Sequence, residues 1–127
     1  FLQNHHKEGY FIEPTIITNL SNESKVMQEE IFGPVVTVTP FEDMDQLVEW
    51  ANSTTFGLSA SIWTKDLRQA QQLSKELAVG QVWINCWLKR DLRVPFGGVK
   101  ASGLGREGGR YSLNMYTETK NICMDLS

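Results

Sequence analysis

The sequence has few of the features that mark several large classes of protein. It contains only 2 cysteines among 127 residues, Cys86 and Cys123, which are too few and too far apart for a disulfide framework or a metal knuckle. The histidines His5 and His6 have no cysteine or carboxylate cluster at ligand spacing, so we expect solvated imidazoles and no metal site. No apolar run approaches the roughly 20 residues that span a bilayer, so no membrane partner is expected.

An excess of positive charge is also missing. The chain has 12 Lys and Arg against 15 Asp and Glu, a formal net charge of -3, and therefore no basic face for nucleic acid. Reduced thiols are the simplest interpretation of the cysteine content, which predicts a cytoplasmic location. The chain starts with Phe1 and no signal-like leader follows, so we interpret it as a segment of a longer protein.

The regular elements follow from apolar periodicity and helix-start signals. Runs rich in β-branched and aromatic residues predict strands at 9–17, where Pro14 interrupts the ladder, and at 35–39, 58–63 and 81–85. A short helix is expected within 21–30. Asp43 with Gln46, and Asp66 with Gln69, each start an apolar helical stripe, and Gly80 is expected to close the second helix.

The alternation of strands and helices predicts an α/β fold with a largely parallel sheet. Ligand-facing residues of such sheets lie beyond the carboxyl ends of the strands. Two places are therefore of interest: the turn 29–34 and the long glycine-rich loop from Asn85 to about Gly109. A last strand, 116–124, comes after this unit is complete and is free to pair elsewhere.

Two features imitate functional motifs. Residues 103–108, GLGREG, match the G-x-G-x-x-G dinucleotide fingerprint, but they follow a loop and too little chain remains after them for the rest of that motif. We expect these glycines to serve tight turns and close packing instead. Cys86 follows a strand, but no base is close in sequence except Asp91, so we interpret it as a small buried structural residue.

Three stretches in this order resemble the aldehyde dehydrogenase superfamily. They are EEIFGPV at 29–35, VWINC at 82–86 followed by PFGG at 95–98, and KASGLGRE at 100–107. With GYF at 9–11 and YTETK at 116–120, the resemblance covers nearly the whole chain. It implies a three-layer α/β fold, with residues 1–110 forming the C-terminal part of the catalytic domain and residues 111–127 an oligomerisation arm.

The resemblance also implies what the segment lacks. The family's nucleophilic cysteine, its general base and its glycine-rich cofactor fold precede the matched region, and Cys86 is not the nucleophile. We therefore predict that the 127-residue chain alone does not oxidise aldehydes. Measurable NADH production by the purified chain would contradict this. The alternative function is a non-catalytic binding or oligomerisation module.

The cofactor that the resemblance implies is NAD, and NADP stays open because the ribose 2′-position is read upstream. Glu30 matches the glutamate that hydrogen-bonds the hydroxyls of the nicotinamide ribose, a task suited to the two acceptor oxygens of a carboxylate. Phe32 would pack near the nicotinamide ring. The alternative for Glu30 is an exposed carboxylate at a helix end.

Other positions match the substrate side of the family's site. Phe96 resembles the aromatic residue that lines the aldehyde tunnel, although it would also serve as a core side chain beside a turn. Glu107 resembles a glutamate proposed to relay protons. Its alternatives are an ion pair with Arg106 or a charge at a helix N-terminus.

The loop after Cys86 indicates which class of aldehyde is the substrate. It carries Lys89, Arg90 and Arg93, and cationic side chains facing the tunnel suit an aldehyde that bears a carboxylate. The stretch WLKR at 87–90 most resembles the branch that acts on 2-aminomuconic and 2-hydroxymuconic semialdehydes, in which an arginine at position 90 contacts the substrate carboxylate. A solvated basic loop is the alternative. The family's closing strand adds to the sheet of a second copy, so a homo-oligomer is expected.

Overall fold

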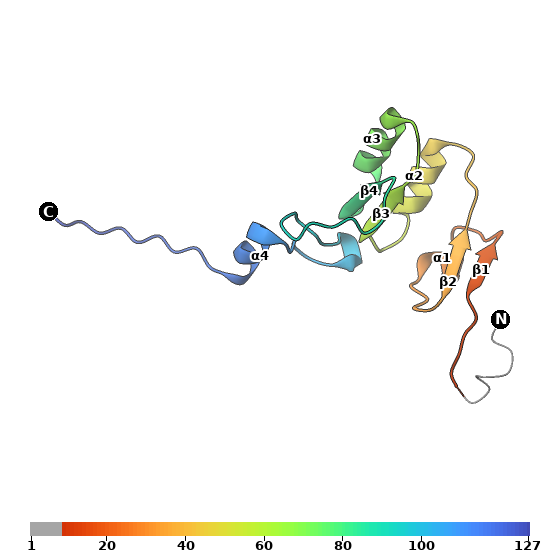
Figure 1. Ribbon diagram of the computed structural model, residues 1–127, viewed down its shortest axis with the longest axis horizontal. Helices are drawn as coiled ribbons and strands as arrows, with labels where there is room; N and C mark the ends of the chain where they lie inside the picture. Colours follow the sequence, from red (N-terminus) through yellow and green to blue (C-terminus); the bar gives the residue numbers. More distant parts are fainter. Residues whose placement is uncertain (1–8) are drawn as a thin grey trace. The chain divides into compact units, whose positions relative to one another are not determined.

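The computed structural model describes residues 9–127, so His5 and His6 lie outside the described residues. The chain forms two compact units, Phe1–Thr54 and Thr55–Ser127, and each is described by itself. The elements follow one another in the order β1, α1, β2, α2, β3, α3, β4, a 3-10 turn and α4 (Figure 1).

The first unit is built on a pair of parallel strands. β1 (Thr15–Thr18) and β2 (Val35–Val38) pair in the register Ile16 with Val36. The first strand begins only after Pro14, so the expected strand over 9–17 forms in its last part and extends by one residue. Proline has no backbone N–H for the ladder, which explains why pairing begins beyond it.

The helices of this unit are short and lie on either side of β2 in the sequence. α1 covers Lys25–Gln28, less than the expected 21–30. α2 covers Met44–Asn52, and its start confirms the predicted cap, because Asp43 accepts a hydrogen bond from the backbone N–H of Gln46 at 2.9 Å. The side-chain oxygen of Gln46 accepts a hydrogen bond from the backbone N–H of Glu42 rather than from that of Asp43.

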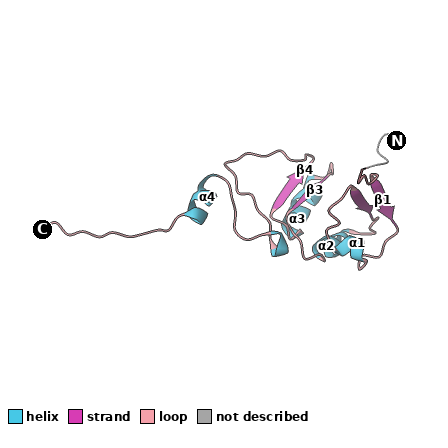
Figure 2. Cartoon of the chain, turned by 90° about the horizontal axis from the view of Figure 1, so that it is seen from below, coloured by secondary structure: helices cyan, strands magenta, loops and turns pink. Residues whose placement is uncertain are grey.

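The second unit contains the buried core of the described chain. β3 (Ser59–Ile62) pairs in parallel with β4 (Gln81–Ile84), and α3 (Leu67–Glu76) connects them and packs on β3 (Figure 2). The buried apolar residues are Ile62, Ala70, Leu73 and Trp83. Asp66 caps α3 by accepting hydrogen bonds from the N–H groups of Arg68 and Gln69, as its sequence position predicts.

Gly80 does not close α3 in the expected way. The helix ends at Glu76, its C-cap is Leu77 in an extended conformation, and Gly80 does not have a positive φ. The reason for glycine is close packing: a Cβ at Gly80 would lie 1.7 Å from the carbonyl oxygen of Gly97. The glycine-rich loop therefore contacts the backbone just before β4.

The remainder of the second unit is mostly loop. The 3-10 turn covers Lys100–Ser102 and α4 covers Gly109–Tyr116. The expected strand at 116–124 is not formed: Tyr116 ends α4, and residues 117–127 are drawn without helix or strand (Figures 1 and 2). A strand requires a paired neighbour, and no other described segment pairs with these residues.

The prediction of parallel strands is confirmed, but the strand partners differ from the expected single sheet. β2 pairs with β1 and β3 with β4, so the described residues form two separate two-stranded sheets. Periodicity locates strands without fixing their partners, which explains the difference. Among residues 9–127 there is no helix of the length and apolar character needed to cross a bilayer.

Candidate functional site

The loop after β4 is fixed by hydrogen bonds to neighbouring segments. Asn85 has a left-handed backbone, and its side-chain amide bonds both the N–H and the carbonyl of Thr64, at 2.9 and 2.8 Å. Asparagine tolerates this conformation better than most residues. The hydroxyl of Ser61 donates to the carbonyl of Cys86 at 3.0 Å. The start of the loop is therefore attached to the second unit's sheet region.

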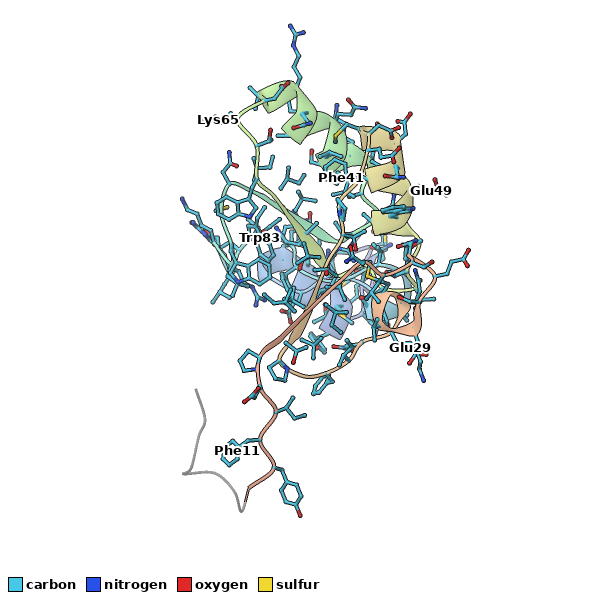
Figure 3. The ribbon with its side chains drawn as sticks, turned by 90° about the vertical axis from the view of Figure 1, so that its right-hand side faces the viewer. Phe11, Glu29, Phe41, Glu49, Lys65 and Trp83 are labelled. Atoms are coloured by element: carbon cyan, nitrogen blue, oxygen red, sulfur yellow. The ribbon has the colours of Figure 1, made fainter. Side chains whose placement is uncertain are left out.

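Trp83 holds the loop at a second point, the backbone of Lys89. Trp83, labelled in Figure 3, lies in β4 and is only 5% exposed. Its indole N–H donates to the carbonyl of Lys89 at 3.0 Å. The Trp83 ring also packs edge-on against Trp87, with centroids 5.3 Å apart. A buried indole needs an acceptor, and here that acceptor is the residue immediately before Arg90. Sequence reasoning missed this role because it treated Trp83 as a strand residue only.

Three of the predicted site residues come together beyond this loop. The guanidinium carbon of Arg90 lies 4.0 Å from the centroid of the Phe96 ring, and its Nη2 lies 2.6 Å from Oε1 of Glu107. Phe96 and Glu107 also form an antiparallel backbone bridge, with both N–H···O distances at 2.8 Å. Arginine over an aromatic face is attracted by the ring quadrupole, so the three side chains form one cluster. We call Arg90, Phe96 and Glu107 the arginine cluster.

The ion pair between Glu107 and Arg106, given above as one alternative for Glu107, is not formed. Arg106 instead donates to the carbonyl groups of Gly98 and Gly105, at 2.8 and 2.7 Å. Glu107 lies two residues before α4 begins, and its side chain pairs with Arg90 of the basic loop. A depression of about 330 Å³ adjoins the cluster and is lined by residues that include Phe96, Leu104, Arg106, Glu107, Met115 and Tyr116.

Glu30 and Phe32 belong to the first unit and line one depression there. This open depression of about 410 Å³ lies between the end of α1 and β2. Glu30 is exposed and follows the C-cap of α1, so the alternative of an exposed carboxylate near a helix end agrees with its position. The helix-end ion pair is made by the neighbouring Glu29, with Lys25 at 3.6 Å. Glu30 therefore keeps its carboxylate oxygens available.

Phe32 has an unusual conformation for a large side chain. Its φ is 55° and the residue is 92% exposed. A bulky residue with a positive φ is strained, and such strain is found mainly where function requires a fixed orientation. The side chain is not a core residue of the described chain. Its exposure and strain favour a contact with a ligand or with another part of a larger protein.

The structure supports the interpretation of the glycine motif, while the interpretation of Cys86 as a structural thiol stays a prediction. The segment 103–108 follows the 3-10 turn rather than a strand, so it lacks the context of a dinucleotide fingerprint. Gly108 has a φ of 105°, and a Cβ there would lie 2.2 Å from the carbonyl oxygen of Val94, which accounts for glycine. Cys86 is half-buried, and both cysteines are free. No group of side chains suited to a metal ion occurs among residues 9–127.

Comparisons with known proteins agree with these motifs. A family model described as the aldehyde dehydrogenase family matches residues 2–122. The 2-aminomuconic semialdehyde dehydrogenase of Danio rerio is 49% identical over 114 residues, which is 90% of this chain and 23% of that protein. The 2-hydroxymuconic semialdehyde dehydrogenase of Pseudomonas putida is 48% identical over 122 residues, 96% of this chain and 25% of that protein.

The fold comparison gives the same result. The NAD+ complex of an aldehyde dehydrogenase from Bacillus cereus superposes with a TM-score of 0.89 at 40% identity, covering 97% of this chain and 25% of that one. The chain thus spans about a quarter of the length of these relatives. Aldehyde dehydrogenase 1A1 of Oryctolagus cuniculus is also 48% identical over 120 residues, so overall identity does not distinguish between substrates.

Proposed function

Because the chain belongs to the aldehyde dehydrogenase family, we propose that it is the C-terminal segment of an enzyme that oxidises a carboxylate-bearing semialdehyde to the acid. In this proposal residues 1–110 complete a three-layer catalytic domain. The observation that carries the substrate class is the arginine cluster. Arg90 already binds a carboxylate, that of Glu107, while Phe96 supports the face of its guanidinium.

A substrate carboxylate would meet a suitable group in Arg90. A guanidinium offers paired N–H donors that match the two oxygens of a carboxylate, and its charge does not depend on pH in the working range. The carbonyl of Lys89 is held by Trp83, so the backbone directly before Arg90 has a fixed position. Phe96 would then contact the aliphatic part of the same substrate. The names of the muconic semialdehyde dehydrogenase relatives support this substrate class.

We propose NAD as the cofactor, which when bound accepts the hydride that leaves the aldehyde carbon. Glu30 and Phe32 fit a nicotinamide riboside because an unpaired carboxylate and an exposed aromatic ring line the same depression. Glu30 would accept hydrogen bonds from the ribose hydroxyls, and Phe32 would limit movement of the ring. A proton-relay role for Glu107 stays a prediction from the family resemblance.

The nucleophile and the general base would come from the rest of the longer protein, so the 127-residue chain alone is expected to be inactive. Three apolar side chains on β1 and β2 are exposed: Ile16, Val36 and Val38. Their exposure supports the proposal that another part of the longer protein covers these strands. A cytoplasmic location is part of the same proposal, since the cysteine pattern predicts no disulfide framework.

We include homo-oligomerisation through residues 111–127 in the proposal. Ile122, Met124 and Leu126 are exposed and recur at every second position. In an extended strand such residues lie on one face, which is the pattern needed to add a strand to a neighbouring sheet.

The substrate class is tested by Arg90→Ala in the full-length protein that carries this segment. Charge-assisted hydrogen bonds contribute about 1.5–3 kcal/mol, so kcat/KM for a carboxylate-bearing semialdehyde should fall roughly 10- to 150-fold. A neutral aldehyde of similar length should be oxidised at an almost unchanged rate.

Arg93→Ala is the matched control, because Arg93 lies in the same loop, is paired with Asp91 and has an 87% exposed side chain. It should leave both substrates nearly unaffected. Equal losses in the two variants, or an equal loss for the neutral aldehyde in Arg90→Ala, would contradict a contact between Arg90 and the substrate carboxylate.

A further inference from the structure

We propose that Glu107 is a specificity-determining residue that acts through Arg90, as an internal counter-ion which the substrate carboxylate must displace. The inference rests on the proposed function. In that function Arg90 promotes binding of the substrate carboxylate, and we infer that Glu107 opposes it. Its basis is the geometry of the arginine cluster.

The position of Glu107 is set by its backbone rather than by its ion pair. Its N–H and carbonyl both bond Phe96, each at 2.8 Å, so the residue is aligned with the aromatic ring below the guanidinium. Gly108, the next residue, packs on the carbonyl of Val94 with no room for a Cβ. The Cα of Glu107 therefore stays beside Phe96 whether or not the ion pair is formed, which keeps the carboxylate within reach of Arg90.

Arg90 has few other ways to satisfy its charge. One face of the guanidinium lies on Phe96, and Glu107 is the only carboxylate within ion-pair distance among the residues that the structure describes. The side chains of Arg90 and Glu107 are 38% and 58% exposed, so an incoming anion can reach the pair from solvent. The site is thus accessible and already occupied by a protein carboxylate.

Displacement is favoured only for a well-placed carboxylate. The contact joins one nitrogen of Arg90, Nη2, to one oxygen of Glu107. A substrate carboxylate can make two parallel hydrogen bonds to a guanidinium, which is the stronger arrangement. Anions that bind through a single oxygen gain nothing over Glu107. Glu107 therefore lowers the affinity of Arg90 for all anions, and only a carboxylate that makes two hydrogen bonds to the guanidinium binds well.

The test uses Glu107→Gln in the full-length protein, which keeps the side-chain size and the backbone bridge and removes the charge. Glutarate, a dicarboxylate without an aldehyde, serves as the probe in calorimetric titrations. Because exposed ion pairs contribute little each, we expect glutarate to bind roughly two- to five-fold more tightly to Glu107→Gln than to the unmodified protein. KM for the carboxylate-bearing semialdehyde should fall by a similar factor, and KM for a neutral aldehyde should not change.

Glu49→Gln is the control for the loss of one negative charge. Glu49 is exposed on α2 and makes no side-chain hydrogen bond or ion pair with the rest of the described chain (labelled in Figure 3). It should leave the glutarate affinity unchanged. A general electrostatic effect would instead raise the affinity in both variants and overturn the inference.

A double-mutant cycle separates competition from a structural role. In Arg90→Gln, addition of Glu107→Gln should have no effect on glutarate affinity, because the guanidinium for which Glu107 and glutarate compete is absent. Weaker glutarate binding by Glu107→Gln alone would show that Glu107 orients Arg90, and would overturn the inference. Unchanged affinity, or no glutarate binding by any variant, would overturn it as well.

The same measurements distinguish the inference from the proposed function. If the protein oxidises no carboxylate-bearing semialdehyde but Glu107→Gln still binds glutarate more tightly, the proposed substrate is wrong and the competition stands. If Arg90→Ala abolishes the substrate preference but Glu107→Gln changes neither KM nor glutarate affinity, only the inference fails. A lower kcat in Glu107→Gln at reduced KM would add a separate proton-relay role.

Discussion

Asp91 and Arg93 form a local ion pair next to the arginine cluster. The side-chain Nε of Arg93 donates to both oxygens of Asp91, at 2.9 and 3.1 Å, and the backbone N–H of Arg93 donates to Oδ1 at 2.9 Å. These bonds, the side-chain ones first, hold the pKa of Asp91 below its ordinary value of 3.8. Arg93 is thus paired with its sequence neighbour away from Phe96, and in our proposal Arg90, which lies on Phe96, is the arginine that contacts the substrate.

The ion pair predicts a pH dependence with a definite sign. A carboxyl group whose pKa is lowered in the folded state stabilises that state at pH values above its ordinary pKa, and this contribution is lost as the pH falls through the folded-state pKa. Both groups are solvent-exposed, so the effect on stability should be small and weakened by salt. In Arg93→Ala, the pKa of Asp91 followed by NMR titration of its side chain should rise toward 3.8. An unchanged pKa would contradict the ion pair.

The sequence located the arginine cluster without predicting its contacts. Arg90, Phe96 and Glu107 lie in one loop region, and the family resemblance singled out each of them. Arg106, its neighbour, was one alternative partner for Glu107, whereas the structure gives Arg90, 17 residues away. The backbone bridge between Phe96 and Glu107 decides this pairing, and no periodic pattern in the sequence records such a bridge.

Elements that depend on local chemistry were predicted well. The starts of α2 and α3 follow directly from Asp43 and Asp66, whose side chains accept backbone N–H bonds within the first turn. The strand pairs depend on distant residues, and there the sequence analysis was less complete. It expected β2 to share a sheet with β3, but β2 pairs with β1.

Gly80 provides a prediction at the scale of these elements. A Cβ at this position would clash with the carbonyl of Gly97, and both groups are backbone that cannot rotate away. Gly80→Ala should therefore separate the glycine-rich loop from the start of β4 and lower the free energy of unfolding by about 1–3 kcal/mol, measured by chemical denaturation.

Gly33→Ala is the matched control for this substitution. A Cβ at Gly33 has no neighbour within 4 Å, and its φ is not positive, so stability should change little. If both glycine variants proved equally stable, the close approach of Gly80 and Gly97 would not contribute to folding. Because the loop carries Phe96, Gly80→Ala should also weaken any ligand contact of the arginine cluster.

At the scale of the whole molecule, the described residues bury few large side chains. Only Ile62, Ala70, Leu73 and Trp83 are buried apolar residues. Val36 and Val38 belong to the strand predicted at 35–39, and both are exposed. The apolar residues of a strand indicate that one face of its sheet is covered in the complete protein, but they do not indicate which segment covers it. The proposed longer protein, of which this chain would form about a quarter, supplies such a segment.

The extended segment 117–127 has a consequence for how the protein is degraded. Proteases cleave unpaired backbone far faster than backbone that is hydrogen-bonded in a sheet. Lys120 lies in this segment and is exposed, so trypsin should cut after it readily while the segment has no partner strand. Assembly through the segment would protect this bond, and cleavage should slow as the protein concentration rises.

Lys65 provides the internal reference for such an experiment. It is exposed in the turn between β3 and α3, outside the proposed assembly segment (Figure 3). Cleavage there should not depend on protein concentration, whereas loss of the terminal peptide, followed by mass spectrometry, should. Identical concentration profiles at Lys65 and Lys120 would contradict assembly through the segment. If the profiles differ as expected, residues 117–127 are the part of the chain at which a protease distinguishes a free subunit from an assembled one.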